Sequence, residues 1–250
     1  MKKSILAFIL LIFILCSGCR TLNIEKETNK TVSNSIATQE TTISTEKIFH
    51  GTISNEESNE ASVDYKFDSN KVLENIKVTP YSYKSMFSYN FVVLLKNNSE
   101  MDCELNFSVD FLDENGNIVG TESDSVDAFA SGTEVALTFY CDDEFSSYEY
   151  TMEVSQLEYY KCVTQNLSCE VNIATDKSII SVTNNGDIDA DFVEYTALYF
   201  YNDTLVDTDW GYIVDDDSQI KSHKTQKEES TCYEDFDTVR VYLDARASDF

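Results

Sequence analysis

The chain has 250 residues, with 45 acidic and 18 basic side chains and a formal net charge of −27. A chain this acidic is repelled by nucleic acid and by anionic lipid, so nucleic-acid binding is excluded as a role. Tyr and Phe occur fifteen times each and Pro once, and this composition favours half-buried β-strands.

The first 18 residues have the order of a secretory signal peptide. Lys2 and Lys3 form a short positive region, and an unbroken apolar run extends from Ile5 to Leu15. This run is shorter than the roughly 20 residues that a bilayer core needs. We therefore expect export and cleavage rather than a membrane span.

Cys19 ends this segment in a pattern that resembles the bacterial lipobox. The small residues Ser17 and Gly18 precede Cys19, although Cys16 stands where the lipobox usually has Leu. The resemblance implies a palmitate-type lipid on Cys19, cleavage just before it, and an anchor on the outer face of a bacterial cell membrane. Two lipid chains hold a protein stably there. The alternatives are modification of Cys16 and an ordinary secretory signal that ends in Cys.

Residues 19–70 are predicted to form a disordered stalk. Thr, Ser, Asn and Glu dominate positions 20 to 48, without a sustained period of 2 or 3.6. The piece 49–69 is ambiguous, since it could also hold one or two strands.

From residue 71 the sequence predicts short strands separated by turns. Positions 104–111 alternate apolar and polar side chains, as in a half-buried strand. Asn115-Gly116 then predicts a hairpin, because both residue types accept positive φ. A Ser-Gly turn and further alternating strands follow at 131–132, 135–139 and 148–154.

The same order recurs later in the chain. Positions 94–103 match 181–190, and each stretch leads from a strand through an Asn-Asn turn into an acidic bend. Asn202-Asp203 then replaces the Asn-Gly hairpin. We therefore predict an all-β fold of two tandem immunoglobulin-like β-sandwiches, which are residues 71–160 and 161–250.

Each copy resembles the FxLYD-type and related immunoglobulin-like domains of bacterial surface lipoproteins. The residues that carry the resemblance are Asn97-Asn98, 109–116 and Ser131-Gly132 in the first copy, and Asn184-Asn185 and 199–203 in the second. The second copy departs from the pattern, with Ser222-His223-Lys224 in place of the Gly turn. The resemblance covers about two-thirds of the chain by these short motifs. It implies a fold and a cell-envelope setting, and it carries over no catalytic residue.

Five cysteines follow Cys19, an odd number that cannot all pair within the chain: Cys103, Cys141, Cys162, Cys169 and Cys232. Cys162 and Cys169 are close enough in sequence to close a small disulfide loop in an oxidising space, or they could stay reduced. The sequence disfavours zinc, because it has neither CxxC pairs nor neighbouring His residues.

Two acidic stretches are candidates for a calcium-binding site. Asp113–Asn117 has its Gly at the fourth place and lies between predicted strands, which favours a hairpin over an EF-hand. The run 215–217, with Asp207 and Asp209 nearby, is the densest acidic group. A solvated loop is favoured there, and a Ca²⁺ site is the alternative.

No catalytic arrangement is recognisable in the sequence. His50 and His223 lie in different units, and nothing resembles a nucleophile elbow. Trp210, the single Trp, is expected in the core, with an aromatic platform for sugar or peptide as the alternative.

The sequence therefore predicts a non-catalytic binding or envelope-spacer protein that needs no cofactor and no metal. Its expected partners are the membrane, through the anchor on Cys19, and an envelope protein or polysaccharide. The alternative is an extracytoplasmic hydrolase or solute-binding receptor, which would need a polar pocket between the two copies.

Overall fold

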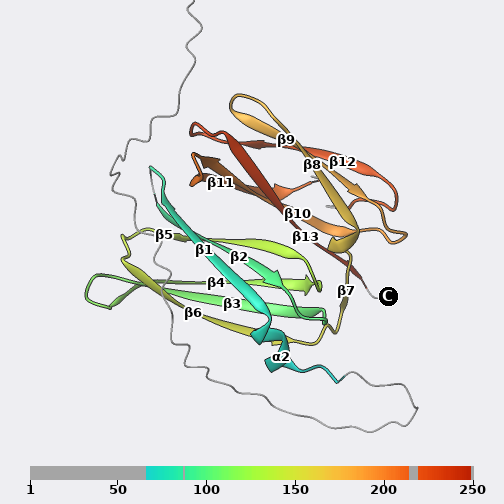
Figure 1. Ribbon diagram of the computed structural model, residues 1–250, viewed down its shortest axis with the longest axis horizontal. Coiled ribbons are helices and arrows are strands. Elements are labelled where there is room, and N and C mark those ends of the chain that lie inside the picture. Colours follow the sequence, from blue (N-terminus) through green and yellow to red (C-terminus); the bar gives the residue numbers. More distant parts are fainter. Residues whose placement is uncertain (1–65, 87, 214–218, 249–250) are drawn as a thin grey trace, which may run out of the picture. The chain divides into compact units, whose positions relative to one another are not determined.

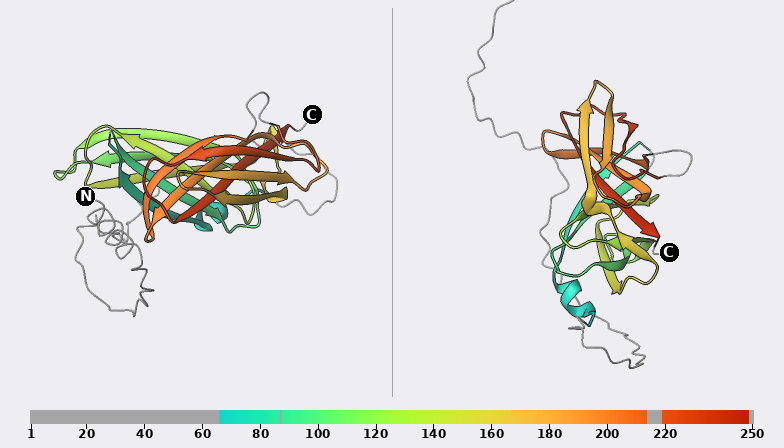
Figure 2. Two further views of the ribbon diagram at one scale, coloured as in Figure 1. Left: turned by 90° about the horizontal axis from the view of Figure 1, so that it is seen from above. Right: turned by 90° about the vertical axis from the view of Figure 1, so that its right-hand side faces the viewer.

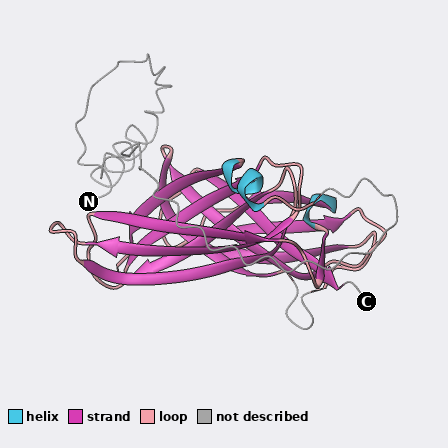
Figure 3. Ribbon diagram, turned by 90° about the horizontal axis from the view of Figure 1, so that it is seen from below, coloured by secondary structure: helices cyan, strands magenta, loops and turns pink. Residues whose placement is uncertain are grey.

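The computed structural model describes residues 66–250 except 87, 214–218 and 249–250, and strands dominate this part of the chain (Figure 3). The predicted signal peptide, Cys19 and the stalk as far as residue 65 lie outside the described residues. The last residues of the predicted stalk already belong to a helix, α2 (Ser69–Glu74). Its N-cap residue Asp68 accepts a hydrogen bond from the Lys71 N–H at 3.2 Å.

The first half of the described chain contains two antiparallel sheets of three strands each (Figure 1). Its strands are β1 (Ile76–Lys84), β2 (Tyr89–Asn97), β3 (Cys103–Leu112), β4 (Ile118–Phe129), β5 (Glu134–Cys141) and β6 (Ser147–Ser155). One sheet has the order β1-β2-β5, and the other has the order β4-β3-β6. The all-β prediction is confirmed.

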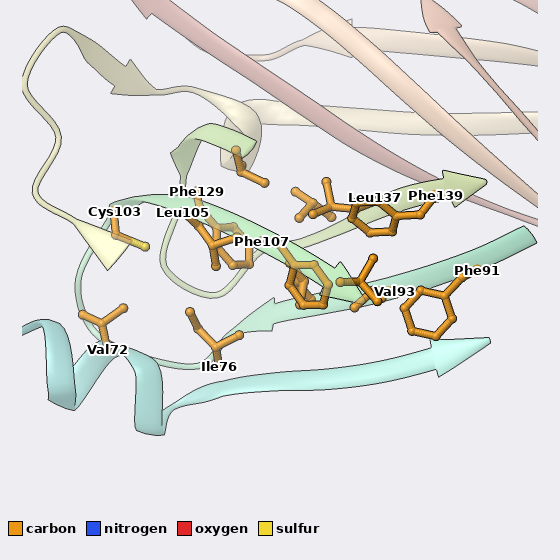
Figure 4. Packing of buried hydrophobic residues seen from close by; sticks show 14 of the residues in the cluster. Val72, Ile76, Phe91, Val93, Cys103, Leu105, Phe107, Phe129, Leu137 and Phe139 are labelled. Atoms are coloured by element: carbon orange, nitrogen blue, oxygen red, sulfur yellow. The ribbon is translucent and has the colours of Figure 1, made fainter. Parts of the chain in front are cut away.

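A core rich in aromatic side chains lies between these two sheets (Figure 4). The alternating strand predicted at 104–111 is the central part of β3, and its apolar residues are fully buried. Phe107 stacks on Phe139 of the facing sheet, with ring centroids 5.5 Å apart. Phe91 meets Phe111 edge to face at 5.7 Å. Paired rings of this kind add to the stabilisation that burial itself provides.

The predicted hairpin after β3 is present. Gly116 has φ +80, and its N–H donates to the Asp113 carbonyl at 3.0 Å. The side chain of Asp113 accepts hydrogen bonds from the backbone N–H groups of Asn115 and Asn117, each at 2.8 Å. A single carboxylate therefore fixes the turn and with it the register between β3 and β4.

The second half repeats this plan with one additional strand. Its strands are β7 (Tyr160–Cys162), β8 (Leu167–Ile173), β9 (Lys177–Asn184), β10 (Asp191–Tyr201), β11 (Thr204–Tyr212), β12 (Thr225–Thr231) and β13 (Thr238–Ser248), and a 3₁₀ turn, η1, spans Thr164–Asn166. The sheets have the orders β12-β9-β8 and β11-β10-β13-β7. They enclose a second core around Tyr199, whose ring meets Phe236 at 4.8 Å. Figure 2 shows the same strands in two further views.

A fully buried asparagine ends β2 in the first half and β9 in the second. The Asn97 side-chain amide donates to the carbonyls of Met101 at 2.9 Å and Phe129 at 3.2 Å. In the second half, Asn184 donates in the same way to Ile188 at 2.8 Å and Ile220 at 3.0 Å. The Asn-Asn turns that match in sequence thus make the same hydrogen bonds, and each joins two loops at one end of its half.

The two halves meet through the faces of their sheets that point away from the cores. Val92 on β2 packs with Leu198 and Phe200 on β10 and with Leu205 on β11, and all four side chains are buried. A buried hydrogen bond joins the same sheets, from the Thr196 hydroxyl to the Ala136 carbonyl at 3.2 Å. Strands β2 and β10 are therefore covered on both faces. We call this contact the junction.

Candidate functional site

The acidic turn after β3 is a structural turn. Hydrogen bonds from Asn117, followed by those from Asn115, lower the pKa of the Asp113 carboxyl to about 2. Both Asp113 oxygens accept from the Asn117 side chain, so the carboxylate is already engaged within the hairpin.

Asp207 and Asp209 of the second acidic group accept hydrogen bonds from backbone and hydroxyl groups. Asp209 accepts from the Ser230 hydroxyl at 2.8 Å and the Tyr195 hydroxyl at 3.1 Å. Asp207 accepts from the Tyr233 N–H at 3.0 Å. The run 215–217 lies outside the described residues. Among the residues that the structure describes, no group of three or more His, Cys, Asp or Glu side chains is arranged to hold a metal ion.

His223 occupies the place of the Gly turn in the second half. Its φ is +56, where Gly132 of the first half has φ +79, and its ring nitrogen Nε2 lies 3.0 Å from an Asp187 oxygen. Both side chains are exposed. His223 is thus a surface residue that keeps the turn despite its Cβ, and His50 lies outside the described residues.

The expectation that Trp210 is a core residue is wrong. Trp210 is 52% exposed on β11, an edge strand of its sheet, and Tyr212 is 41% exposed two positions further along. Residues two apart on a strand point to the same face, so the two rings share a face. Trp210 lies directly opposite Thr196 in the pairing of β11 with β10, which places it beside the junction.

The five described cysteines are all free thiols, including Cys162 and Cys169. Of the two alternatives left open by the sequence, the structure has the reduced pair and no loop-closing disulfide between Cys162 and Cys169. Cys162 lies on β7, beyond η1 from Cys169 on β8, and both side chains are half-buried. Burial raises the pKa of the Cys103 thiol to about 12 and that of the Cys169 thiol to about 11, which leaves both thiols protonated and unreactive at neutral pH.

The most unusual group of charges lies at the junction. Glu194 on β10 is directly opposite Asp244 on β13 in the antiparallel pairing, and both side chains are half-buried. Like charges at directly opposite positions destabilise a sheet. Asp124 of β4, from the first half, acts on the Glu194 carboxyl as a third negative charge. We call these three residues the junction acids.

One arginine lies among these acids. Arg246 on β13 forms an ion pair with Asp127 of β4 across the junction at 2.8 Å, with its side chain 23% exposed. Its guanidinium also lies over the rings of Phe192 at 4.3 Å and Tyr160 at 4.8 Å. Its Nε is buried without a hydrogen-bond partner in the described part of the chain.

The environment of the junction acids raises the pKa of all three carboxyls. Burial, followed by the Glu194 charge, raises the pKa of Asp244 to about 7, and Arg246 offsets part of this shift. Burial and then the Asp124 charge raise the pKa of Glu194. Desolvation raises the pKa of Asp124 as well. Two ionised carboxylates cannot share such a site without repulsion, so a proton on Asp244 stabilises the junction near neutral pH.

Two shallow hollows lie on the described structure. One, of about 210 Å³, lies at the junction and is lined by residues that include Lys77, Lys96, Glu134 and Tyr242. Lys96 and Glu134 form an exposed ion pair there at 3.1 Å. The other, of about 340 Å³, lies against β3 and β4 and is lined mainly by Ser and Asn side chains.

Sequence reasoning missed the junction acids. They stand at 124, 194 and 244, far apart in the chain, and only the packing of β4 against β10 and β13 brings them together. A signal was present in β10, where Glu194 interrupts a mostly apolar strand. A charge within an apolar strand indicates a special environment, but it does not identify its neighbours.

Comparisons with known proteins add little to this site. No family model matches the sequence, and no curated protein matches it. Among solved structures, the chain is similar to the crystal structure of red sea bream transglutaminase, with 13% identity and a TM-score of 0.23. The match covers 68% of this chain and 29% of that one. Over the described residues, no helix is both long and apolar enough to cross a membrane.

Proposed function

We propose that this chain is a lipid-anchored protein of the outer face of a bacterial membrane, built from two tandem immunoglobulin-like sandwiches, that acts by non-catalytic binding or as an envelope spacer. The anchor rests on the sequence from Lys2 to Cys19. The observation that carries the spacer and binding role is the junction, where Val92, Leu198 and Phe200 are buried between the two halves. A buried apolar contact of this kind favours a close arrangement of the two halves.

Exposed aromatic side chains beside the junction support the binding role. Trp210 and Tyr212 share one face of the edge strand β11, and each offers a ring and a polar tip to solvent. Trp and Tyr are the residue types most often found at the centre of binding surfaces. An envelope protein or polysaccharide is the partner class that we propose for this face.

The proposed anchor is tested by mass spectrometry of the mature N-terminus. We expect a diacylglycerol-modified Cys19 as the first residue. Cys19→Ser should release the chain from the membrane, whereas Cys16→Ser should leave it anchored. An unmodified N-terminus at any other position would refute the anchor.

The proposed binding face is tested with purified envelope polysaccharide and with envelope proteins in separate experiments. Trp210→Ala should weaken binding at least tenfold, because a central aromatic contact commonly contributes 2 kcal/mol or more, about a thirtyfold change in affinity. Tyr233→Ala is the control, since Tyr233 is 89% exposed at a different place in the second half. Equal binding by the Trp210 variant and the wild type in both experiments would refute the proposed binding face, and only the spacer role would remain.

A further inference from the structure

The two halves are held together by a contact that combines apolar packing with unbalanced charge. The apolar part consists of Val92, Leu198, Phe200 and Leu205. The charged part consists of the junction acids, of which Glu194 and Asp244 are directly opposite each other on neighbouring strands. The apolar part favours contact at every pH, whereas the charged part depends on protonation.

The charged groups around Asp244 come from every element packed against it. Glu194 on β10, Arg246 on β13 and Asp127 on β4 act on Asp244 itself. Asp124 on β4 acts on Glu194. The Cys162 thiol on β7 is affected by Asp244 and by Asp102 in the loop before β3. Burial keeps the Cys162 thiol protonated, since it raises the pKa of that group. Arg246 is the one cation of this set, and its shortest contact is the ion pair with Asp127. Within this set the carboxylates therefore outnumber the positive charge.

We propose that the junction is a proton-dependent latch, which is closed when Asp244 is protonated and loosened when Asp244 and Glu194 are both ionised. The neutral Asp244 carboxyl carries no charge that would repel the Glu194 carboxylate on the neighbouring strand. After ionisation, the same two groups repel each other in a partly desolvated contact. Movement of the sheet that carries Glu194 and Asp244 away from the first half relieves that repulsion, because water then solvates both charges.

The direction of the pH dependence follows from the raised pKa of Asp244, which is about 7 in the closed junction. In an open junction this carboxyl would be solvated, with an ordinary pKa of about 4. Asp244 therefore binds its proton more tightly in the closed form. The closed form is fully favoured below about pH 4, and this advantage is lost as the pH rises through about 7.

Trp210 provides a built-in reporter for this latch. It is the single Trp of the chain and lies opposite Thr196, whose hydroxyl bonds to the first half across the junction. We would titrate the full chain from pH 5 to pH 8 and record Trp210 emission and its quenching by acrylamide. We expect a red shift and stronger quenching as the pH rises, with a midpoint near pH 7.

Three variants separate the latch from a general effect of pH. Asp244→Asn cannot ionise, so its Trp210 signal should stay in the closed form up to pH 8. Glu194→Gln removes the neighbouring charge, so the two groups can never both be ionised, and the opening transition should be lost or move to higher pH. Glu149→Gln is the matched control, because Glu149 and Asp110 are also directly opposite each other but Glu149 is exposed to solvent. This variant should follow the wild type.

A wild-type signal that stays constant from pH 5 to pH 8 would overturn the proposal. The same holds if Asp244→Asn retains the wild-type transition or if Glu149→Gln loses it. If Asp244→Asn fails to fold, Glu194→Gln decides the question: a transition that is lost or moved to higher pH supports the latch, and an unchanged or lower midpoint rejects it.

Discussion

Replacement of Asn97 by alanine tests whether the buried asparagine at the end of β2 is a main source of stability. Its side chain is fully buried and makes four hydrogen bonds. The amide donates to the carbonyls of Met101 and Phe129. Its oxygen accepts from the Ser99 N–H at 3.0 Å and the Ser99 hydroxyl at 2.6 Å. Alanine replaces none of these contacts.

The stability lost in Asn97→Ala follows from the backbone groups that lose a hydrogen bond to the Asn97 side chain. The Phe129 carbonyl and the Ser99 N–H lose a side-chain hydrogen bond in a site that water does not reach. The Met101 carbonyl keeps a bond from the Ser99 hydroxyl at 3.0 Å. Each buried group left unpaired costs about 1–3 kcal/mol, so we expect Asn97→Ala to lower the free energy of unfolding by about 3–5 kcal/mol.

Urea unfolding measures this cost, with far-UV circular dichroism and Trp210 fluorescence as two probes. Trp210 lies in the second half, while Asn97 lies in the first. If the junction couples the halves, both probes should move together to lower urea. Asn98→Ala is the control, because Asn98 is exposed and next in sequence, and it should cost less than about 0.5 kcal/mol. A loss below 1 kcal/mol for Asn97→Ala would refute this reasoning.

Three further predictions use other features. Gly132→Ala should lower stability by about 1 kcal/mol and His223→Gly should raise it by a similar amount, since both positions have positive φ; urea midpoints measure this, and equal midpoints would contradict it. Leu198→Ala should cost about 2–5 kcal/mol in the same assay, because its side chain is fully buried in the junction. The Cys103 thiol, with its pKa raised to about 12, should react with Ellman's reagent at pH 8 only after unfolding; rapid reaction of the native chain would disprove its burial.

Local patterns predicted the strands and turns of this protein well. Strand β3 follows from its alternation, and the Asp113 turn follows from Asn-Gly, because both signals depend only on neighbouring residues. The match between the two Asn-Asn turns also has a physical basis, since Asn97 and Asn184 make the same pairs of carbonyl contacts. A side chain with this many obligatory partners constrains the residues around it.

Features that depend on packing between the halves could not be predicted. Trp210 is exposed on the edge strand β11. The local pattern of apolar and polar residues does not show which strand lies at the edge of a sheet. The junction acids require β4 of one half to lie near β10 and β13 of the other. Composition indicated an acidic chain, but it did not show that Glu194 and Asp244 share a partly desolvated contact.

The burial of β2 on both faces has a consequence for folding after the proposed export. The first half contains all the strands of its own core, so this core can close once β6 has crossed the membrane. Val92 and the outward side chains Tyr81 and Leu94 stay uncovered until β10 and β13 have also crossed and folded. The first half therefore exposes an apolar stripe while about 90 more residues follow, and we expect the need for a folding chaperone to be greatest in that interval.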